Sequence, residues 1–512
     1  MHSNRYVLPI LGLSLLSACS DNGSTGPSHV PTSMTITLDT LDFGSQLAAG
    51  VVVKDQQGAP MDINQIAGQI TLESSDSTVA AVDGTSLTLV ATGLGNAVIT
   101  ARYGNLEAHG TLPVRLGPAP AQRLVAGDGH NCVITASGTT ECWGLGENGT
   151  LGDGLTSTAS TGSPVIVAGE HTFTTLTAGN MTCGLEDGAA WCWGSGSDGA
   201  LGNGADTNAV APVAVHGGLT FAQISAGWGH VCALTTDGSA YCWGYNADGE
   251  VGSGTVSSIE TEPVPVDVDV KFAQIQASGD HTCALTRLGK LYCWGYGLYG
   301  VLGTVNGGDQ HSPVAALDTL TFVSLSGGYY HECGLDRTGR AICWGRNNFG
   351  ETGTGTVSDS LLSPVAIQST ARFALLGAGT EEHLCGVERE TSQLYCWGQN
   401  RQGQIGNGDT NDALSPAAVP GFLASAVTTG LMHSCAIDTS GDVYCWGNNQ
   451  VGQIGNGSID STGTNYVLTP SKVADIGTVS AMRTAPNVDS EDVLQRASTF
   501  SLSDRPKHHV RR

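Results

Sequence analysis

Charged side chains are scarce in this sequence. They make up 13% of the 512 residues, whereas an average globular protein has about 25%. Acidic residues outnumber lysine and arginine by 46 to 21, so the chain has a net charge of −25 and would repel phosphate backbones. The sequence also contains no phosphate-binding loop and no recognisable nucleophile–base–acid arrangement. We therefore expect no nucleic-acid partner, no cofactor and no enzymatic activity, unless loops from distant segments assemble a site.

Long amphipathic helical patterns are also absent, and glycine is abundant. Gly accounts for 72 residues, which is roughly twice the usual share. Such a composition, rich also in threonine, serine and valine, predicts many short strands joined by tight turns. The expected fold class is all-β, and the length of the chain suggests more than one domain.

Residues 1–19 are predicted to be a lipoprotein signal peptide. Arg5 precedes an apolar run, residues 6–16, that is too short for a membrane span and is followed by Ser, Ala and Cys19. This ending resembles a bacterial lipobox, in which the cysteine is lipidated. The alternative is an ordinary signal peptide with a stray cysteine. With residues 20–33 as a flexible linker, we expect an exported protein anchored through Cys19 to the bacterial outer membrane or cell surface.

Residues 34–117 contain no cysteine and differ in sequence pattern from the rest of the chain. About seven short β-prone runs, separated by Gly, Asp, Ser and Pro, predict an immunoglobulin-like β-sandwich. The segments 74–83 and 91–101 look like the bacterial Ig-like group 2 family, and the resemblance covers this whole region. It implies a surface module without catalysis, which either spaces the next domain from the membrane or adheres.

A cysteine, a short hairpin and the letters Cys-Trp-Gly then recur seven times, and successive first cysteines are 49 to 52 residues apart. A period near 50 residues is typical of a propeller or solenoid, in which one supersecondary unit is copied. The seven pairs are Cys132 with Cys142, Cys183 with Cys192, Cys232 with Cys242, Cys283 with Cys293, Cys333 with Cys343, Cys385 with Cys396, and Cys435 with Cys445.

Each pair is predicted to form a disulfide across its hairpin. If Cys232 faces Cys242, a three-residue loop remains, and the second copy, which is one residue shorter, leaves the two-residue turn Asp187-Gly188. Directly opposed cysteines lie within bridging distance. Free thiols and metal ligation are the alternatives, because six copies carry a histidine two residues before the first cysteine. The signal peptide and the loss of this histidine at Met181 favour disulfides, and we expect no metal.

The copies share the pattern Ala-Gly-x-x-His-x-Cys-Ala-Leu, followed by Tyr-Cys-Trp-Gly-x-Asn and a glycine-rich turn, most completely in residues 430–457. This pattern resembles the regulator of chromosome condensation (RCC1) repeat over residues 118–483. The resemblance implies a seven-bladed β-propeller with four strands per blade. We also expect residues 478–482 to help close the ring against a terminal blade, and residues 484–512 to be disordered.

Function is expected where the copies differ. The variable positions precede the repeated histidine or follow Trp-Gly, and equivalent loops should emerge on one face of the ring. Aromatic residues at such places suit a protein interface, although they could instead pad the grooves between blades. The predicted partner-binding residues are Trp228, Tyr245, Tyr296, Tyr299, Tyr329, Tyr330, Phe349 and Met432.

These observations predict a monomeric, non-catalytic binding scaffold for an unidentified protein or glycan. An inhibitor is one version of this hypothesis, because exported bacterial propellers that resemble the RCC1 repeat include inhibitors of β-lactamase. Guanine-nucleotide exchange, the activity of the eukaryotic namesake, is the alternative, and export argues against it. A carbohydrate-active enzyme is the third hypothesis.

Overall fold

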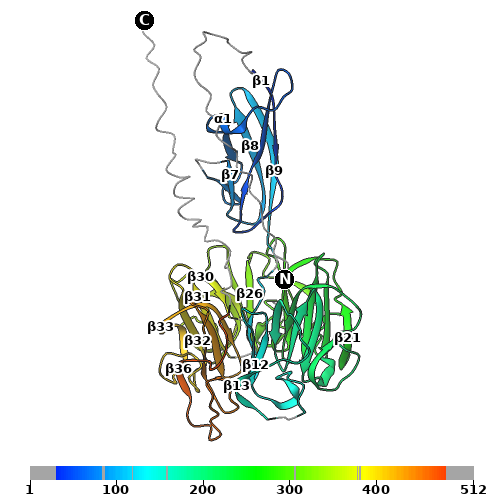
Figure 1. The fold of residues 1–512 in the computed structure, drawn as a ribbon, viewed down its shortest axis with the longest axis vertical. Coiled ribbons are helices and arrows are strands. Elements are labelled where there is room, and N and C mark those ends of the chain that lie inside the picture. The colour runs from blue at the N-terminus through cyan, green and yellow to red at the C-terminus, as the bar shows by residue number, and fades with distance from the viewer. Residues whose placement is uncertain are drawn as a thin grey trace, which may run out of the picture.

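The computed structural model describes residues 30–479, apart from 84–86, 118, 157–158, 305–306, 378 and 380–381. These residues form an N-terminal β domain and a ring of seven β-sheet blades (Figure 1). The predicted lipidation residue Cys19, residues 20–29 of the predicted linker 20–33 and the predicted tail 484–512 lie outside the described residues. Among the residues that are described, no helix is long and apolar enough to cross a membrane.

The N-terminal β domain has its own core, in which Val53, Leu89, Ile99 and Leu112 are buried. It starts at Pro31, three residues before the predicted boundary, and its strands overlap all seven predicted runs. Its assignment to an immunoglobulin-like family stays a prediction. Its elements are β1 (Pro31–Thr37), β2 (Leu41–Asp42), β3 (Gln46–Ala48), β4 (Gly50–Asp55), α1 (Ile63–Ile66), η1 (Ala67–Gln69), β5 (Thr71–Ser74), β6 (Ala80–Val82), β7 (Thr88–Ala91), β8 (Gly95–Tyr103) and β9 (Leu106–Arg115). They pair as β1-β4, β2-β9-β8-β5 and β3-β7-β6.

Each blade is an antiparallel sheet of four strands, which confirms the expected all-β class and the propeller. The innermost strands are β10 (Leu124–Ala126), β14 (Thr175–Ala178), β18 (Phe221–Ala226), β22 (Phe272–Ala277), β26 (Ser324–Gly327), β30 (Phe373–Leu376) and the second half of β33 (Ala413–Thr429). The second strands are β11 (His130–Ile134), β15 (Met181–Glu186), β19 (His230–Thr235), β23 (His281–Thr286), β27 (His331–Leu335), β31 (His383–Glu388) and β34 (His433–Asp438).

The third strands carry Cys-Trp-Gly, and the fourth strands form the outer rim. The third strands are β12 (Thr140–Gly144), β16 (Ala189–Gly194), β20 (Ala240–Tyr245), β24 (Leu291–Gly295), β28 (Ala341–Asn347), β32 (Gln393–Gly398) and β35 (Val443–Gly447). The fourth are β13 (Thr161–Ile166), β17 (Ala209–Ala214), β21 (Ile259–Pro265), β25 (Gln310–Ala316), β29 (Ser358–Ala366), the first half of β33 and β36 (Val467–Lys472). Single 3-10 turns η2 (Glu147–Gly149), η3 (Ser197–Gly199) and η4 (Leu298–Gly300) follow three of the third strands.

All seven cysteine pairs form disulfides between directly opposed residues of the second and third strands, with Cα atoms 4.0 to 4.1 Å apart. The bonds join Cys132 with Cys142, Cys183 with Cys192, Cys232 with Cys242, Cys283 with Cys293, Cys333 with Cys343, Cys385 with Cys396, and Cys435 with Cys445. The disulfide prediction is therefore confirmed for every pair, and each cystine lies in the register of its hairpin.

Differences in the spacing between the two cysteines of a blade are compensated by the length of the hairpin turn, as predicted. In blade 2, where the spacing is 9 residues, Asp187 and Gly188 both have positive φ, at 50° and 82°. This is the two-residue turn that the shorter spacing requires. In blade 6, where the spacing is 11 residues, Ser392 takes a positive φ of 61° in the longer turn.

The seven Cys-Trp tryptophans are fully buried and join neighbouring blades. Six of their indoles donate to a backbone carbonyl of the preceding blade, as Trp294 does to Glu250 at 2.8 Å. In blades 2 to 7 a phenylalanine packs on the tryptophan, with ring centroids 5.5 to 6.1 Å apart. Blade 1 has no such phenylalanine, and Val479, from the end of the described chain, lies in the buried cluster of Trp143 instead.

The predicted role of residues 478–482 in ring closure is supported for the two residues that are described. Val479 donates to the Gly441 carbonyl of blade 7 at 2.8 Å, and the Thr478 carbonyl accepts from Ala136 of blade 1 at 2.9 Å. In blades 2 to 6 the same position is held by the residue that begins the next blade, as Phe272 donates to Gly238. After blade 7 the chain therefore repeats the first residues of a blade, and these residues close the ring by bonding to both blade 7 and blade 1.

The repeated histidines also connect the blades. All six are at most 1% exposed, and burial lowers the pKa of His130 to about 4 and that of His230 to about 3, so that these rings are neutral at pH 7. Except in His331, the Nε2 atom of each histidine shares a hydrogen bond with a side chain of the next blade. That side chain belongs to the residue directly after the equivalent histidine position. The pairs are His130–Thr182 (2.7 Å), His230–Thr282 (2.8 Å), His281–Glu332 (3.3 Å), His383–Ser434 (2.8 Å) and His433–Asn131 (2.9 Å).

Two blades depart from this pattern in opposite ways. In blade 2, Met181 replaces the histidine and shares a buried cluster with Val231, the apolar residue at the partner position of blade 3. In blade 5 the histidine is retained, but the partner position holds Leu384, and His331 Nε2 has no hydrogen-bond partner. The Met–Val pair is therefore a compatible replacement, whereas the His–Leu pair leaves a buried polar atom unpaired.

We expect methionine at position 331 to stabilise the protein. His331→Met removes an unpaired buried nitrogen and should raise the free energy of unfolding by about 1 kcal/mol. His230→Met is the matched control: it removes the bond to Thr282 and should lower the free energy by about 1 kcal/mol or more. Guanidinium denaturation of both variants measures the two changes, and a loss of stability of the same size in both would contradict this account of the histidine pairs.

The ring has two distinct faces because adjacent strands are antiparallel. The hairpin face carries the turns between second and third strands and the connections between blades. The loop face, at the opposite end, carries the connections from first to second and from third to fourth strands. The N-terminal β domain sits on the hairpin face (Figure 1), where Leu116 donates to the Arg287 carbonyl at 2.7 Å and Arg337 donates to the Thr78 carbonyl at 3.0 Å.

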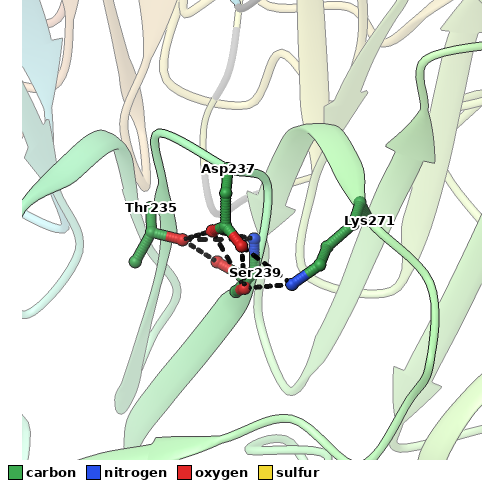
Figure 2. A network of polar contacts seen from close by, with 4 residues as sticks. All are labelled: Thr235, Asp237, Ser239 and Lys271. Carbon is green, nitrogen blue, oxygen red and sulfur yellow. Dashed lines mark hydrogen bonds and ion pairs between the residues drawn. The ribbon is translucent and has the colours of Figure 1, made fainter.

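Polar side chains shape the hairpin turns. In blade 3, Asp237 accepts hydrogen bonds from Thr235 and Ser239 and forms an ion pair with Lys271 at 3.0 Å (Figure 2). The bonds from Thr235 and Lys271 hold the pKa of Asp237 well below its usual value. The side chains of Asp237 and Lys271 are 63% and 57% exposed, so this network orders the turn and adds little to global stability.

Candidate binding surface

The two faces of the propeller differ in charge. Eight of the lysines and arginines in residues 119–479 lie in the hairpin turns or blade connections, and Lys472 ends β36 at the same hairpin face. Only Arg346 and Arg401 belong to the loop face. The loop face is rich in acids: Asp128, Glu147, Asp153, Asp198, Asp206, Asp248, Asp280, Asp309, Glu382, Asp409, Asp412 and Asp460. It therefore presents a negative potential to a partner.

Four predicted binding residues meet on the loop face of blades 4 and 5. Tyr330 is the centre of the group, with its ring centroid 4.4 Å from that of Tyr329, 5.4 Å from Tyr296 and 5.3 Å from Tyr299. Tyr299 is 37% exposed and the other three are partly exposed. Burial and the negative charge of Asp280 raise the pKa of Tyr330 to about 12, so the phenol is neutral. Partly exposed, mutually packed tyrosines are typical of interface anchors.

The two loop-face arginines extend this group onto blades 5 and 6. Phe349 lies between their guanidinium groups, 5.4 Å from Arg346 and 4.7 Å from Arg401. Arg346 also lies 5.9 Å from the Tyr330 ring and forms an ion pair with Glu382. The arrangement is held by cation–π contacts and by two ion pairs of Arg346, with Glu382 and, at 4.0 Å, with Glu351, and it continues the aromatic surface around the ring.

The remaining predicted residues lie on the same face, but not all join the cluster. Trp228 is in the loop of blade 3 and donates from its backbone to the Ser278 carbonyl of blade 4 at 3.2 Å. Tyr245 follows on the same blade and interacts electrostatically with Asp248 and Asp280. Met432 is in the equivalent loop of blade 7, where its carbonyl accepts from Asn448 at 2.9 Å. Five of the eight predicted residues, the four tyrosines of blades 4 and 5 and Phe349, are thus linked by ring contacts or through Arg346, whereas Trp228 and Tyr245 lie on the neighbouring blade 3 and Met432 on blade 7.

Two buried carboxyl groups lie beneath this surface. Glu250 and Glu351 are 0% exposed and each accepts a backbone hydrogen bond, at 3.0 and 2.7 Å, while the second oxygen has no hydrogen-bond partner. Blades 6 and 7 have glutamine at this position. Burial raises the pKa of Glu250 to about 8 and that of Glu351 to about 7. These carboxyl groups are therefore largely or partly protonated near pH 7.

One buried group has the residue types of a metal site or a hydrolase triad. Ligand atoms of His281, Cys283 and Glu332 lie within 4.8 Å of one another, and Ser278 is adjacent to Glu332. Cys283 is in a disulfide, so its sulfur is not a thiolate ligand. Ser278, His281 and Glu332 are at most 1% exposed, which denies a substrate access. The group is an interface between blades 4 and 5.

The ring also encloses a cavity of about 160 Å³ between the innermost strands. It is lined by uncharged groups, among them Gln122, Thr177, Ser225 and Gln276. Several of these join the blades: Ser225 accepts from the Ala277 amide at 2.9 Å. The cavity follows from ring geometry, and its lining contains no titratable side chain.

Sequence reasoning missed Asp280, Glu250 and Arg401. Glu250 carried a usable signal, because a charged residue at a position occupied by Thr, Ala, Val or Gln in five other copies predicts an unusual buried group. Asp280 and Arg401 occupy variable positions, Asp280 directly before the repeated histidine and Arg401 after Trp-Gly, but only aromatic residues and Met432 were selected at such positions. Their proximity to the aromatic residues depends on how neighbouring blades pack.

Comparisons with known proteins agree with this architecture. The family model of the RCC1-like domain matches residues 88–427, and two models of the regulator of chromosome condensation (RCC1) repeat match residues 425–453 and 440–484. The ultraviolet-B receptor UVR8 of Arabidopsis thaliana is 28% identical over 194 residues, which are 36% of this chain and 43% of UVR8. The E3 ubiquitin-protein ligase HERC2 of Homo sapiens is 29% identical over 34% of this chain and 4% of its own. The chain thus spans less than half the length of these relatives.

Solved structures share the fold at low identity. Prp20p of Saccharomyces cerevisiae is 20% identical with a TM-score of 0.58, over 74% of this chain and 95% of that one. Human WBSCR16 is 18% identical with a TM-score of 0.57, over 66% of this chain and 94% of that one. The family match covers well over half of the sequence and includes the first six blades. The chain belongs to the family of RCC1-like domains.

Proposed function

We propose that the protein is an exported, lipid-anchored, non-catalytic scaffold that binds a protein partner through the loop face of its propeller. The observation that carries the proposal is the packed, partly exposed tyrosine group around Tyr330, continued by Phe349 and its two arginines. Tyrosine and arginine are the residue types enriched at the energetic centres of protein interfaces. By fold, Prp20p offers an analogy, because it is described as binding Gsp1p and histones.

The placement of the N-terminal β domain supports this choice of face. The domain occupies the hairpin face, and its first strand, β1, reaches the end of the domain that points away from the propeller (Figure 1). An anchor at Cys19 would therefore hold the hairpin face toward the membrane and present the loop face outward. Seven disulfides are expected to persist in an oxidising compartment, which supports export.

Capture experiments with matched variants test the proposal. Tyr330→Ala and Phe349→Ala should each weaken capture of the partner from neighbouring-cell extract about tenfold or more, because each removes the centre of one aromatic group. Thermal unfolding should change little, since both side chains are partly exposed. Leu155→Ala on the loop face of blade 1 and Leu288→Ala on the hairpin face serve as controls, because both side chains are exposed and lie outside the group.

Equal capture by all four variants would contradict binding at the tyrosine group. Loss of capture only in Leu288→Ala would instead assign binding to the hairpin face. Treatment of the extract with glycosidases separates a glycan from a protein partner, and complete loss of capture after that treatment would replace the protein with a glycan.

A further inference from the structure

The loop face of blades 3 to 5 combines tyrosines with carboxylates. Five of the chain's twelve tyrosines are here: Tyr245, Tyr296, Tyr299, Tyr329 and Tyr330. Asp280 interacts with Tyr329 through a side-chain hydrogen bond and is close enough to Tyr330 to raise its pKa. Asp248 interacts electrostatically with both Tyr245 and Tyr296. We call these five tyrosines with Asp248 and Asp280 the tyrosine–aspartate cluster.

The cluster has the chemistry of a cation site but contains no cation of its own. Aromatic faces and carboxylates both attract ammonium and guanidinium groups. The loops of blades 1 to 4 on this face include no lysine or arginine. Arg346 reaches only the rim, 5.9 Å from the Tyr330 ring, and is already paired with Glu382. His311 acts electrostatically on Asp248 and the buried His281 on Asp280, but these loops supply no lysine or arginine to pair with either carboxylate.

A buried carboxyl oxygen beneath the cluster, which has no hydrogen-bond partner, is a second, independent indication of a binding site here. Glu250 is 0% exposed, and its Oε1 has no hydrogen-bond partner. In blades 6 and 7 the equivalent glutamine amides donate to Gln399 and Asn448, the residues after Trp-Gly, at 3.1 Å. In blade 3 that position is Tyr245. The unpaired side of the Glu250 carboxyl group therefore faces the cluster.

We propose that the tyrosine–aspartate cluster binds a lysine or arginine side chain presented by the protein partner, with Asp280 and Asp248 as counter-ions, the tyrosine rings as walls and the buried carboxyl group of Glu250 beneath them as a further source of negative charge. This inference rests on the proposed function, because it specifies what the partner presents to the loop face. It also assigns the excess of acids on this face a role in attracting a basic surface.

The buried carboxyl group predicts a pH dependence for this site. The titratable groups around Glu250 are Asp248, Asp280 and Tyr245, with His281 beside Asp280 and His311 beside Asp248. With the pKa of Glu250 at about 8, the free site holds a proton near pH 7, and a bound guanidinium favours the ionised form. Binding should therefore release a proton, and affinity should rise with pH up to about 8.

Calorimetric titration with an oligo-arginine peptide tests the proposal, with a glutamine peptide of equal length as the uncharged control. We expect the arginine peptide alone to bind, and Asp280→Asn to weaken binding about tenfold. Glu250→Gln, which restores the residue used in blades 6 and 7, should weaken binding and reduce proton release, while the remaining release comes from Asp248 and Asp280, whose pKa values burial also raises. Asp206→Asn is the matched control, because Asp206 is an exposed acid of the same face on blade 2.

Equal weakening by Asp280→Asn and Asp206→Asn would show non-specific attraction to an acidic face and overturn the proposal, as would unchanged binding in Tyr330→Leu. The outcomes also separate this inference from the proposed function. If Asp280→Asn and Glu250→Gln retain full capture of the natural partner while Tyr330→Ala loses it, the cation site is wrong and the loop face remains the binding surface.

Discussion

Alanine in place of Trp294 is expected to lower the free energy of unfolding by about 3–5 kcal/mol. The side chain is 0% exposed, packs against Phe272 with centroids 6.1 Å apart, and donates to the Glu250 carbonyl of blade 3 at 2.8 Å. The variant would leave a cavity in the interface between blades 3 and 4 and would remove one of the two hydrogen bonds to the Glu250 carbonyl, which also accepts from Thr282 at 3.2 Å. Guanidinium denaturation followed by circular dichroism measures the change.

Two other tryptophans provide the controls for this prediction. Trp228→Ala should cost less than about 1 kcal/mol, because Trp228 lies in a loop and is partly exposed. Trp193→Phe should cost less than Trp294→Phe, since the Trp193 indole nitrogen has no hydrogen-bond partner. Equal losses for Trp228→Ala and Trp294→Ala would contradict the assignment of the Cys-Trp tryptophans to inter-blade packing.

Removal of one disulfide is the second large effect that we expect. The double variant with Cys283→Ala and Cys293→Ala should lose about 2–3 kcal/mol, because a bridge across a sequence separation of 10 restricts the unfolded chain. Both sulfur atoms are fully buried in the core of blade 4, so part of the loss comes from packing.

The reducing agent supplies the control for the disulfide. Under reducing conditions the wild-type protein should lose the stabilisation from all seven disulfides. The difference in free energy of unfolding between the wild type and the double variant should then shrink to the packing contribution. An unchanged difference between the two proteins in oxidising and reducing buffer would contradict a bond between Cys283 and Cys293.

The propeller could be predicted from the sequence because its determinants are local and repeated. The distance between Cys183 and Cys192 is one residue shorter than in most copies, and the Asp187-Gly188 turn compensates for it within the same hairpin. Because the motif occurs once in each blade, the number of blades can be counted directly from the sequence. The strands of the N-terminal β domain were found for a similar reason, since alternation and turn residues act over a few positions.

The rest depends on contacts between distant segments. The hydrogen bond from Leu116 to Arg287 helps to place the N-terminal β domain on the hairpin face. No sequence pattern near either residue predicts this contact. Val479 replaces the missing phenylalanine of blade 1 only because the ring closes. For the binding surface, variable aromatic residues were a sufficient guide to the tyrosine group, whereas Asp280 became visible only once blades 4 and 5 were packed together.

Hydrogen exchange of the protein with and without its captured partner tests the central claim most directly, since it reports which face the partner covers. We predict slower exchange in the bound state for residues 245–258, 296–303, 328–331 and 346–356, all on the loop face of blades 3 to 5, with unchanged exchange in the N-terminal β domain. Protection confined to the hairpin turns or to residues 31–115 would contradict the assignment of the loop face as the binding surface.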